Sequence, residues 1–205
     1  MGRSVVSKAS LRCSGCAQIP RWCICDAMRQ LVLPLDLAVM IHHAEFYKPT
    51  STGQLIHRIF PASDLILFKH DIPLPESSLV KQDRELLILH PFGESLSPFE
   101  DLSQSRFLLL DGNWSQAAGM LKRFDHLGRK VSLPMQGASR FWLREKQAGT
   151  RYSTIEALIF LLNHFGHLEL AKQCQVIFER HVYAGLLARG KKELAAEYKW
   201  GMPQL

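Results

Sequence analysis

A predicted strand that leads directly into three chemically versatile side chains is the most informative part of this chain. Residues 106–110 form a nearly continuous apolar run, which indicates a short strand covered on both faces, as in a parallel sheet. Ligands of open α/β sheets bind beyond the carboxyl ends of the strands. We therefore expect Asp111, Asn113 and Trp114 to lie together at a substrate site, supplying a carboxylate, an amide and a stacking surface. The same residue types also permit a simpler interpretation, in which Asp111 caps a helix and Trp114 fills the core.

The elements that would position this site alternate along the chain. The sequence predicts further strands at residues 36–42, 65–68, 85–90 and 130–133. It predicts helices at residues 53–59 with Thr52 as the cap, at 115–124, after a capping-box pattern over 153–156 as far as Phe165, and at 168–189. This alternation favours an α/β fold with a mostly parallel sheet flanked by helices.

Polar side chains also follow other predicted strands, in the segments 42–52 and 90–94. The chain lacks the glycine-rich dinucleotide fingerprint, the phosphate-binding loop and the Gly-x-Ser-x-Gly elbow. Nucleoside triphosphatases, dinucleotide oxidoreductases and serine hydrolases therefore lose their best signatures. What remains is a site made of loops at strand ends, with one acid, one aromatic ring and several cations.

Four of the five cysteines lie close together, in the pattern Cys13-x2-Cys16-x6-Cys23-x-Cys25. In a reducing compartment this density indicates a metal site, and four thiolates suit tetrahedral zinc. The tight Cys23-x-Cys25 pair leaves an iron–sulfur site or a redox pair as alternatives. We expect residues 1–30 to form a small four-cysteine metal module, with residues 1–10 disordered, and residues 31–205 to form the α/β domain. Cys174 is expected to be a buried apolar residue.

Composition places looser limits on the protein. The formal net charge is +6 and the pI is about 9.2, which is compatible with a polyanionic partner. No apolar run is long enough to span a bilayer, and the basic N-terminus lacks the apolar core of a secretory signal. We expect a cytoplasmic protein with no membrane partner, and the oligomeric state stays open.

Four ordered motifs resemble the DTW-domain proteins, the bacterial tRNA-uridine aminocarboxypropyltransferases. They are the cysteine pattern, the segment 42–55, the DGNWSQA run at 111–117, and STIEA at 153–157, and together they extend along nearly the whole chain. The chain departs from the family pattern at Asn113, where Thr is usual, and at His43, where Pro is usual. The resemblance implies a fold related to the SPOUT methyltransferases, with a knotted cofactor loop towards the C-terminal part of the sheet.

The resemblance further implies transfer of the 3-amino-3-carboxypropyl group of S-adenosylmethionine to N3 of a tRNA uridine, with 5′-methylthioadenosine as the second product. Uridine N3 carries a proton at neutral pH, so a carboxylate at N3 would serve as a general base. Asp111 is the candidate, with burial beside Trp114 raising its pKa, and the alternative is that Asp111 only orients the substrate or contacts the donor. Asn113 keeps a hydrogen-bonding group beside it, and Trp114 is expected to stack on a base or to pack on its helix.

The donor needs its own contacts. We expect Lys48, Thr50 and Thr52 to bind its carboxylate and Glu45 to bind its ammonium group. As in SPOUT-like sites, backbone contacts to adenine would come from Leu89, His90, Pro91 and Leu133. Ser153 and Thr154 complete the predicted donor site, and the alternative for Ser153 is that it and Glu156 only begin a helix.

The tRNA backbone would be held by dispersed cations, and N3 requires an unpaired or extruded base. The candidate cations are Arg12, Arg21, Lys122, Arg123, Arg129, Lys130, Arg140, Arg144, Lys191 and Lys192. Two other functions remain open at this level, namely a SPOUT-type RNA methyltransferase and a non-catalytic zinc-module RNA-binding protein.

Overall fold

A five-stranded, entirely parallel sheet forms the centre of the computed structural model, which describes residues 10–144 and 151–199. The strands lie in the order β2-β1-β4-β3-β5. Their bounds are β1 Asp36–His42, β2 Asp64–Phe68, β3 Glu85–Ser95, β4 Ser105–Asp111 and β5 Arg129–Ser132. The predicted parallel α/β sheet is confirmed, and β4, which leads to Asp111, lies between β1 and β3.

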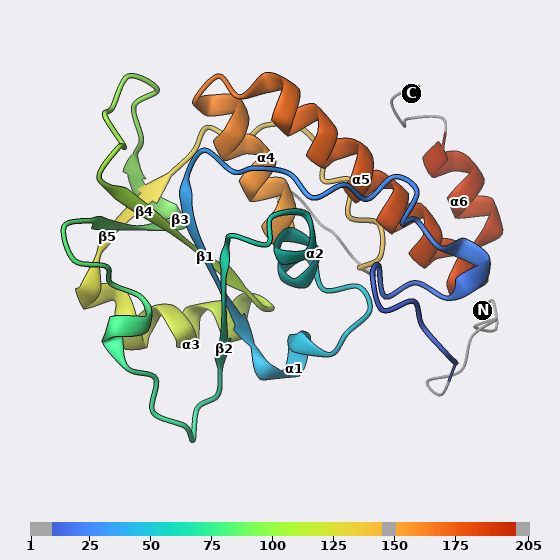
Figure 1. Cartoon of the computed structure of the whole chain (residues 1–205), viewed down its shortest axis with the longest axis horizontal. Coiled ribbons are helices and arrows are strands. Elements are labelled where there is room, and N and C mark those ends of the chain that lie inside the picture. Colours follow the sequence, from blue (N-terminus) through green and yellow to red (C-terminus); the bar gives the residue numbers. More distant parts are fainter. Residues whose placement is uncertain (1–9, 145–150, 200–205) are drawn as a thin grey trace.

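Helices cover both faces of the sheet (Figure 1). On one face α2 (Thr52–Ile59), α4 (Thr154–His164) and α5 (Leu168–Ala188) share a hydrophobic core with Leu37 and Val39 of β1. On the other face α3 (Trp114–Phe124) packs on the alternate residues Ala38 and Met40. Successive side chains of a strand point to opposite faces, so a strand buried on both sides is apolar throughout. For this reason β1 and β4 appear in the sequence as continuous apolar runs and can be predicted as strands.

Short elements complete the chain. They are α1 (His43–Phe46), α6 (Lys192–Lys199) and the 3-10 turns Pro20–Trp22, Glu76–Ser78 and Asp125–Leu127. The sequence did not predict α6, which is held by tertiary contacts: the Arg140 guanidinium stacks 4.0 Å from the ring centroid of the fully buried Tyr198.

Most of the predicted boundaries agree with the structure to within one residue, but the cap of α2 and the end of β3 are wrong. Ser51 rather than Thr52 caps α2, because the Ser51 hydroxyl accepts a hydrogen bond from the backbone N–H of Gln54, whereas Thr52 is already the first helical residue. Strand β3 does not end at His90 but continues to Ser95, after a register shift on β5 between Leu89 and Glu94.

The N-terminal segment lies against α5 (Figure 1). Cys16 and Ile24 pack on Ala184, and the Gln18 amide lies 3.1 Å from Nδ1 of the buried His181. Residues 1–9, part of the segment expected to be disordered, lie outside the described residues, as do 145–150 and 200–205. The knot implied by the family resemblance stays a prediction. The division at residue 30 also stays a prediction. Among the described helices, none is both long and apolar enough to cross a membrane.

Candidate functional site

Two pockets adjoin each other at the carboxyl edge of the sheet. The first, called here the apolar pocket, is lined mainly by apolar side chains from β3, β4, α3, α4 and the segment after β5, including Leu110, Leu133 and Ala157. The second, the polar pocket, is lined by the segment after β1, by Asp111 and Asn113, and by Phe141, Leu143 and Arg144. Both pockets contain Gly112 and Arg144, so one elongated ligand can occupy both.

Asp111 lies at the end of β4 with its carboxylate almost completely buried, since only 3% of the residue is exposed. Its Oδ1 atom accepts hydrogen bonds from the hydroxyls of Thr52 at 3.4 Å and Thr154 at 2.5 Å. Its Oδ2 atom accepts one from Ser51 at 3.2 Å. The carboxylate therefore joins the N-terminal ends of α2 and α4 to the end of the central strand.

Opposing effects act on the pKa of Asp111. Burial raises the pKa above its usual value, and this is the larger effect. The hydrogen bonds from Thr154, Ser51 and the Gly53 amide favour the charged form and offset part of that rise. Gly53 is also required for steric reasons, because a Cβ at this position would clash with Oδ2 of Asp111 at 2.7 Å. The result is a carboxylate that is rigidly held and more basic than an exposed one.

The simpler interpretation of this segment is not what the structure shows. Asn113, not Asp111, caps α3 through a capping box. The Asn113 side chain accepts a hydrogen bond from the backbone N–H of Gln116, and the Gln116 side chain accepts one from the backbone N–H of Asn113. Trp114 is not a core residue: it is 46% exposed and lines the apolar pocket. The guanidinium carbon of Arg151 lies 5.9 Å from its ring centroid.

The predicted donor-binding residues fall into two groups. Glu45, Lys48, Thr50 and Thr52 all line the polar pocket, where the Lys48 ammonium lies 2.6 Å from the Glu45 carboxylate. Residues expected near adenine line the apolar pocket, together with the two residues at the start of α4: Leu89, His90, Pro91, Leu133, Ser153 and Thr154. The pKa of His90 is lowered, first by burial and then by the nearby charge of Lys130.

Three features of the site were missed by sequence reasoning. Ser51 binds Asp111, and only the run of hydroxyl residues at 50–52 signalled it. Arg144, expected at the tRNA backbone, lines both pockets, and Arg189 of the segment after α5 lines the polar one. The start of α4 also has two functions: Ser153 forms the predicted capping box with Glu156, whereas Thr154 binds Asp111.

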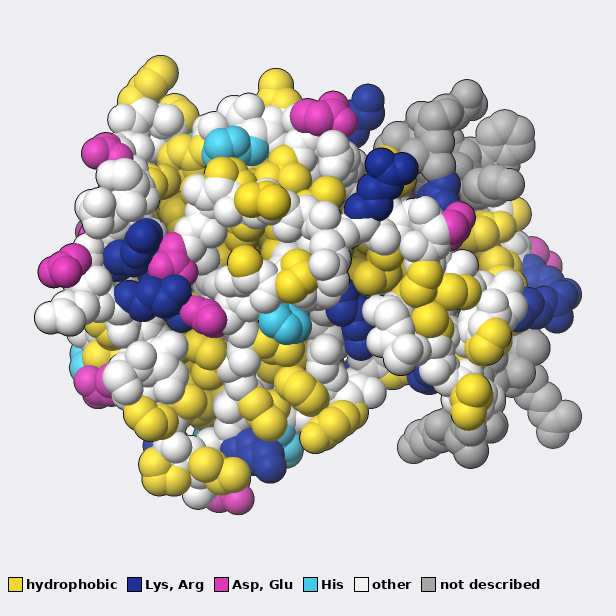
Figure 2. Space-filling view, in the orientation of Figure 1, with side chains coloured by type: hydrophobic (Ala, Val, Ile, Leu, Met, Phe, Trp, Pro, Cys, Tyr) yellow, Lys and Arg dark blue, Asp and Glu magenta, His cyan; other side chains and the backbone are white. Residues whose placement is uncertain are grey.

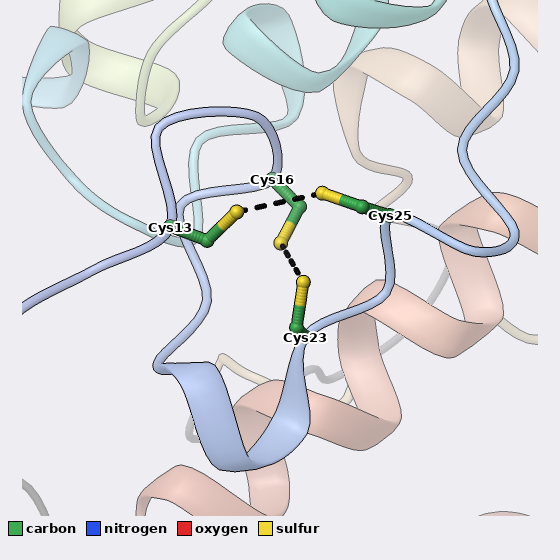
Figure 3. Close-up of side chains that lie close together, drawn as sticks. All are labelled: Cys13, Cys16, Cys23 and Cys25. Carbon is green, nitrogen blue, oxygen red and sulfur yellow. Dashed lines mark hydrogen bonds between the residues drawn. The ribbon is translucent and has the colours of Figure 1, made fainter.

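The four N-terminal cysteines converge on one point (Figure 3). All four sulfur atoms lie within 4.8 Å of one another, with 3.4 Å between Cys13 and Cys25 and 3.6 Å between Cys16 and Cys23. Four Zn–S bonds of about 2.3 Å in a tetrahedron separate the sulfurs by about 3.8 Å. The arrangement therefore fits a single metal ion such as zinc.

The surroundings of the cluster act differently on its thiols, since burial raises the pKa of Cys16 and the hydrogen bond with Cys13 raises the pKa of Cys25. The Cys16 amide, the Cys25 thiol and the Gly15 amide lower the pKa of Cys13 to about 6, and the guanidinium of Arg58 on α2 adds a positive charge nearby. Gly15 is required by space here, because a Cβ would lie 2.9 Å from the Cys25 sulfur. By contrast Cys174 is buried in α5, where burial raises its pKa to about 12, as expected for a core residue.

Basic residues are spread over the molecule, and several adjoin acidic ones on the face shown in Figure 2. Two of the cations expected to grip tRNA form ion pairs within the protein. Arg129 contacts Glu85 and Glu100, and Arg140 contacts the buried Glu179. These two arginines therefore have structural roles.

Comparison with models of protein families gives a match to the DTW domain. The family model of the DTW domain covers residues 10–186, which include the cysteine cluster, the apolar pocket, most of α5 and every residue of the polar pocket except Arg189. No solved structure matches the chain significantly. Because the match extends over most of the sequence, the chain belongs to the DTW-domain family.

Proposed function

We propose that this protein transfers the 3-amino-3-carboxypropyl group of S-adenosylmethionine to N3 of a uridine in tRNA and releases 5′-methylthioadenosine. Membership of the DTW family is consistent with a tRNA-modifying enzyme, and a tRNA substrate agrees with the cytoplasmic location expected from the sequence. One observation carries the finer proposal: an apolar and a polar pocket meet at Gly112 and Arg144 beside the buried Asp111.

The apolar pocket suits the nucleoside end of the donor. Leu110, Leu133 and Met135 line it, and the half-exposed ring of Trp114 offers a stacking surface for adenine. Pockets for nucleosides and similar ligands are lined predominantly by apolar side chains, with a few polar groups that fix orientation. Here those polar groups include Ser153, at the start of α4.

The polar pocket suits the amino acid end of the donor and the acceptor base. Arg144 and Lys48 can bind a carboxylate, and Glu45 can bind an ammonium group. With the two ends of the donor held in different pockets, the sulfonium lies near their junction at Gly112. This geometry directs the first carbon of the aminocarboxypropyl chain, rather than the methyl group, towards the acceptor.

The sulfonium already makes that carbon electrophilic, so the difficult step is to free the N3 lone pair. As N3 forms its bond to carbon, the C–S bond breaks and its electron pair remains on sulfur, which becomes a neutral thioether. The N3 proton passes to Asp111, directly or through the hydroxyl of Ser51 or Thr52, which line the same pocket. A pKa raised by burial supports this role, because it strengthens the proton affinity of the carboxylate.

The cysteine cluster has a structural part in this proposal. Cys13, Cys16, Cys23 and Cys25 would hold a zinc ion that ties the N-terminal segment together where it packs on α5. Bound zinc would supply folding free energy there rather than chemistry at Asp111.

Product analysis tests the proposal. The purified protein is incubated with S-adenosylmethionine and unmodified tRNA, after which nucleosides and small molecules are identified by mass spectrometry. Formation of 5′-methylthioadenosine and of an aminocarboxypropyl-uridine supports the proposal, and Asp111→Asn should lose most of that activity while remaining folded. Formation of S-adenosylhomocysteine and a methylated nucleoside would instead identify a methyltransferase, and tRNA binding without either product would identify a non-catalytic RNA-binding protein.

A further inference from the structure

Three exposed aromatic side chains lie at the carboxyl edge of the sheet. Each belongs to a different one of three neighbouring strands, either within the strand or in the segment that follows it. Tyr47 follows β1 and α1, Trp114 follows β4, and Phe92 lies in β3 within its register shift. Their exposed fractions are 83%, 46% and 85% respectively. The order β1-β4-β3 places the outer two strands about 10 Å apart. Large apolar rings gathered in solvent beside a site mark a surface that binds a partner.

The outer two rings flank the two pockets. Tyr47 packs edge-on against Phe46, with 5.0 Å between ring centroids, and precedes Lys48 of the polar pocket. Phe92 lies 5.7 Å from the ring of His90, which lines the apolar pocket. Tyr47 is thus the sequence neighbour of a residue of the polar pocket, and the Phe92 ring lies beside a residue of the apolar pocket.

Cationic side chains lie among the rings. Lys48 lines the polar pocket, Arg144 lines both pockets, and Arg151 contacts the face of Trp114. Glu45, which pairs with Lys48, partly offsets this charge. Aromatic rings interleaved with cations are how proteins bind single-stranded nucleic acids, because bases stack on the rings and phosphates contact the cations.

We propose that Tyr47 and Phe92 are a pair of base-stacking residues that hold a single-stranded RNA segment across the two pockets. The nucleotides on either side of the reacting uridine stack on these rings. A base that reaches Asp111 through N3 must leave its own stack, and new stacking partners for its neighbours lower the cost of that extrusion. The identity of the central base rests on the proposed function, whereas the stacking does not depend on which group is transferred.

RNA binding by the full chain tests this inference. The probe is a short fluorescein-labelled single-stranded RNA with one central uridine, and the measurement is fluorescence anisotropy at several salt concentrations. Tyr47→Ala and Phe92→Ala should each weaken binding by about five-fold or more. The salt dependence should not change, because no phosphate contact is removed. Tyr47→Phe keeps the ring and should bind as the unmodified protein does.

Phe99→Ala is the matched control. Phe99 is 95% exposed, yet it precedes Glu100, whose carboxylate bonds Arg129 at the amino end of β5 and so lies at the opposite edge of the sheet. Its removal should leave RNA affinity unchanged. A loss equal to that of the other two variants would overturn the inference, because it would show a nonspecific effect of apolar surface.

The two proposals fail in different ways. If transfer product forms but both alanine variants bind RNA as tightly as the unmodified protein, the stacking inference is wrong and the proposed function stands. If both variants lose affinity but no transfer product forms, the stacking inference stands and the proposed function is wrong. Tighter binding to a blunt RNA duplex than to the single strand would also overturn the stacking inference.

Discussion

A single added methyl group at Gly53 tests whether the close approach of α2 to Asp111 controls the site. The Cβ of Gly53→Ala would lie 2.7 Å from Oδ2, 2.9 Å from Cγ and 3.0 Å from Cβ of Asp111. The carboxylate cannot simply rotate away, because Thr154 and Ser51 hold it from two sides. Either the side chain or the start of α2 must therefore move.

The size of the effect follows from opposing contributions. Replacing a helical glycine by alanine normally stabilises a helix by about 0.5–1 kcal/mol. Overpacking costs about 1–3 kcal/mol, and a weakened hydrogen bond to a charged group costs about 1.5–3 kcal/mol. We expect Gly53→Ala to lower the free energy of unfolding by about 2 kcal/mol. A displacement of the carboxylate approaching 1 Å would lower kcat/KM by as much as about 100-fold.

Gly119→Ala is the control, because its Cβ would meet only His70, at an ordinary 3.5 Å, on the outer helix α3. This variant should be slightly more stable than the unmodified protein and equally active. Urea unfolding and initial rates of product formation measure both quantities. If Gly53→Ala matches Gly119→Ala in stability and activity, the contact between α2 and Asp111 does not organise the site.

Other changes test separate parts of the structure. Thr154→Val removes a hydrogen bond that favours the charged form of Asp111, so the pKa of Asp111 should rise and the acidic limb of the kcat/KM–pH profile should move to higher pH. Thr154→Ser keeps the hydroxyl and should leave the limb in place. If Thr154→Val also leaves the limb unmoved, Asp111 is not the base. Gly15→Ala crowds the Cys25 sulfur, so the variant should lose bound metal to a chelator more readily than the unmodified protein, as measured by elemental analysis. Equal metal content in the two proteins would contradict a metal site at this cluster. Trp114→Ala should weaken S-adenosylmethionine binding about ten-fold by calorimetry without changing Tm, because the ring is half-exposed, and a fall in Tm would indicate a packing role instead.

Much of the framework was predictable because local signals and tertiary contacts agree. The strand over residues 36–42 is confirmed with the same bounds, since an apolar run buried on both faces needs no alternation. The capping box of Ser153 and Glu156 is also confirmed. The predicted cap of α2 was wrong because Ser51 and Thr52 both offer a hydroxyl group, and in the structure both hydroxyls also donate to Asp111, so residue type alone does not distinguish them.

The parts that were not predictable depend on distant contacts. Helix α6 has little apolar character of its own and is held by the packing of Tyr198 beneath Arg140. Arg144 lines both pockets only because its segment crosses the edge of the sheet next to Gly112. A sequence identifies residues that can bind a ligand, but the division of those residues between two pockets arises from the folded arrangement.

The three hydroxyl groups that donate hydrogen bonds to Asp111 determine when the site can form during translation. Ser51 and Thr154 come from widely separated parts of the chain, 60 and 43 residues from the carboxylate that they bind. During synthesis the segment up to Asp111 can begin to collapse, but the Asp111 carboxylate lacks the Thr154 hydroxyl until the segment beginning α4 has left the ribosome. Competence to bind ligand should therefore appear abruptly and late in translation, and shorter nascent chains should be inert.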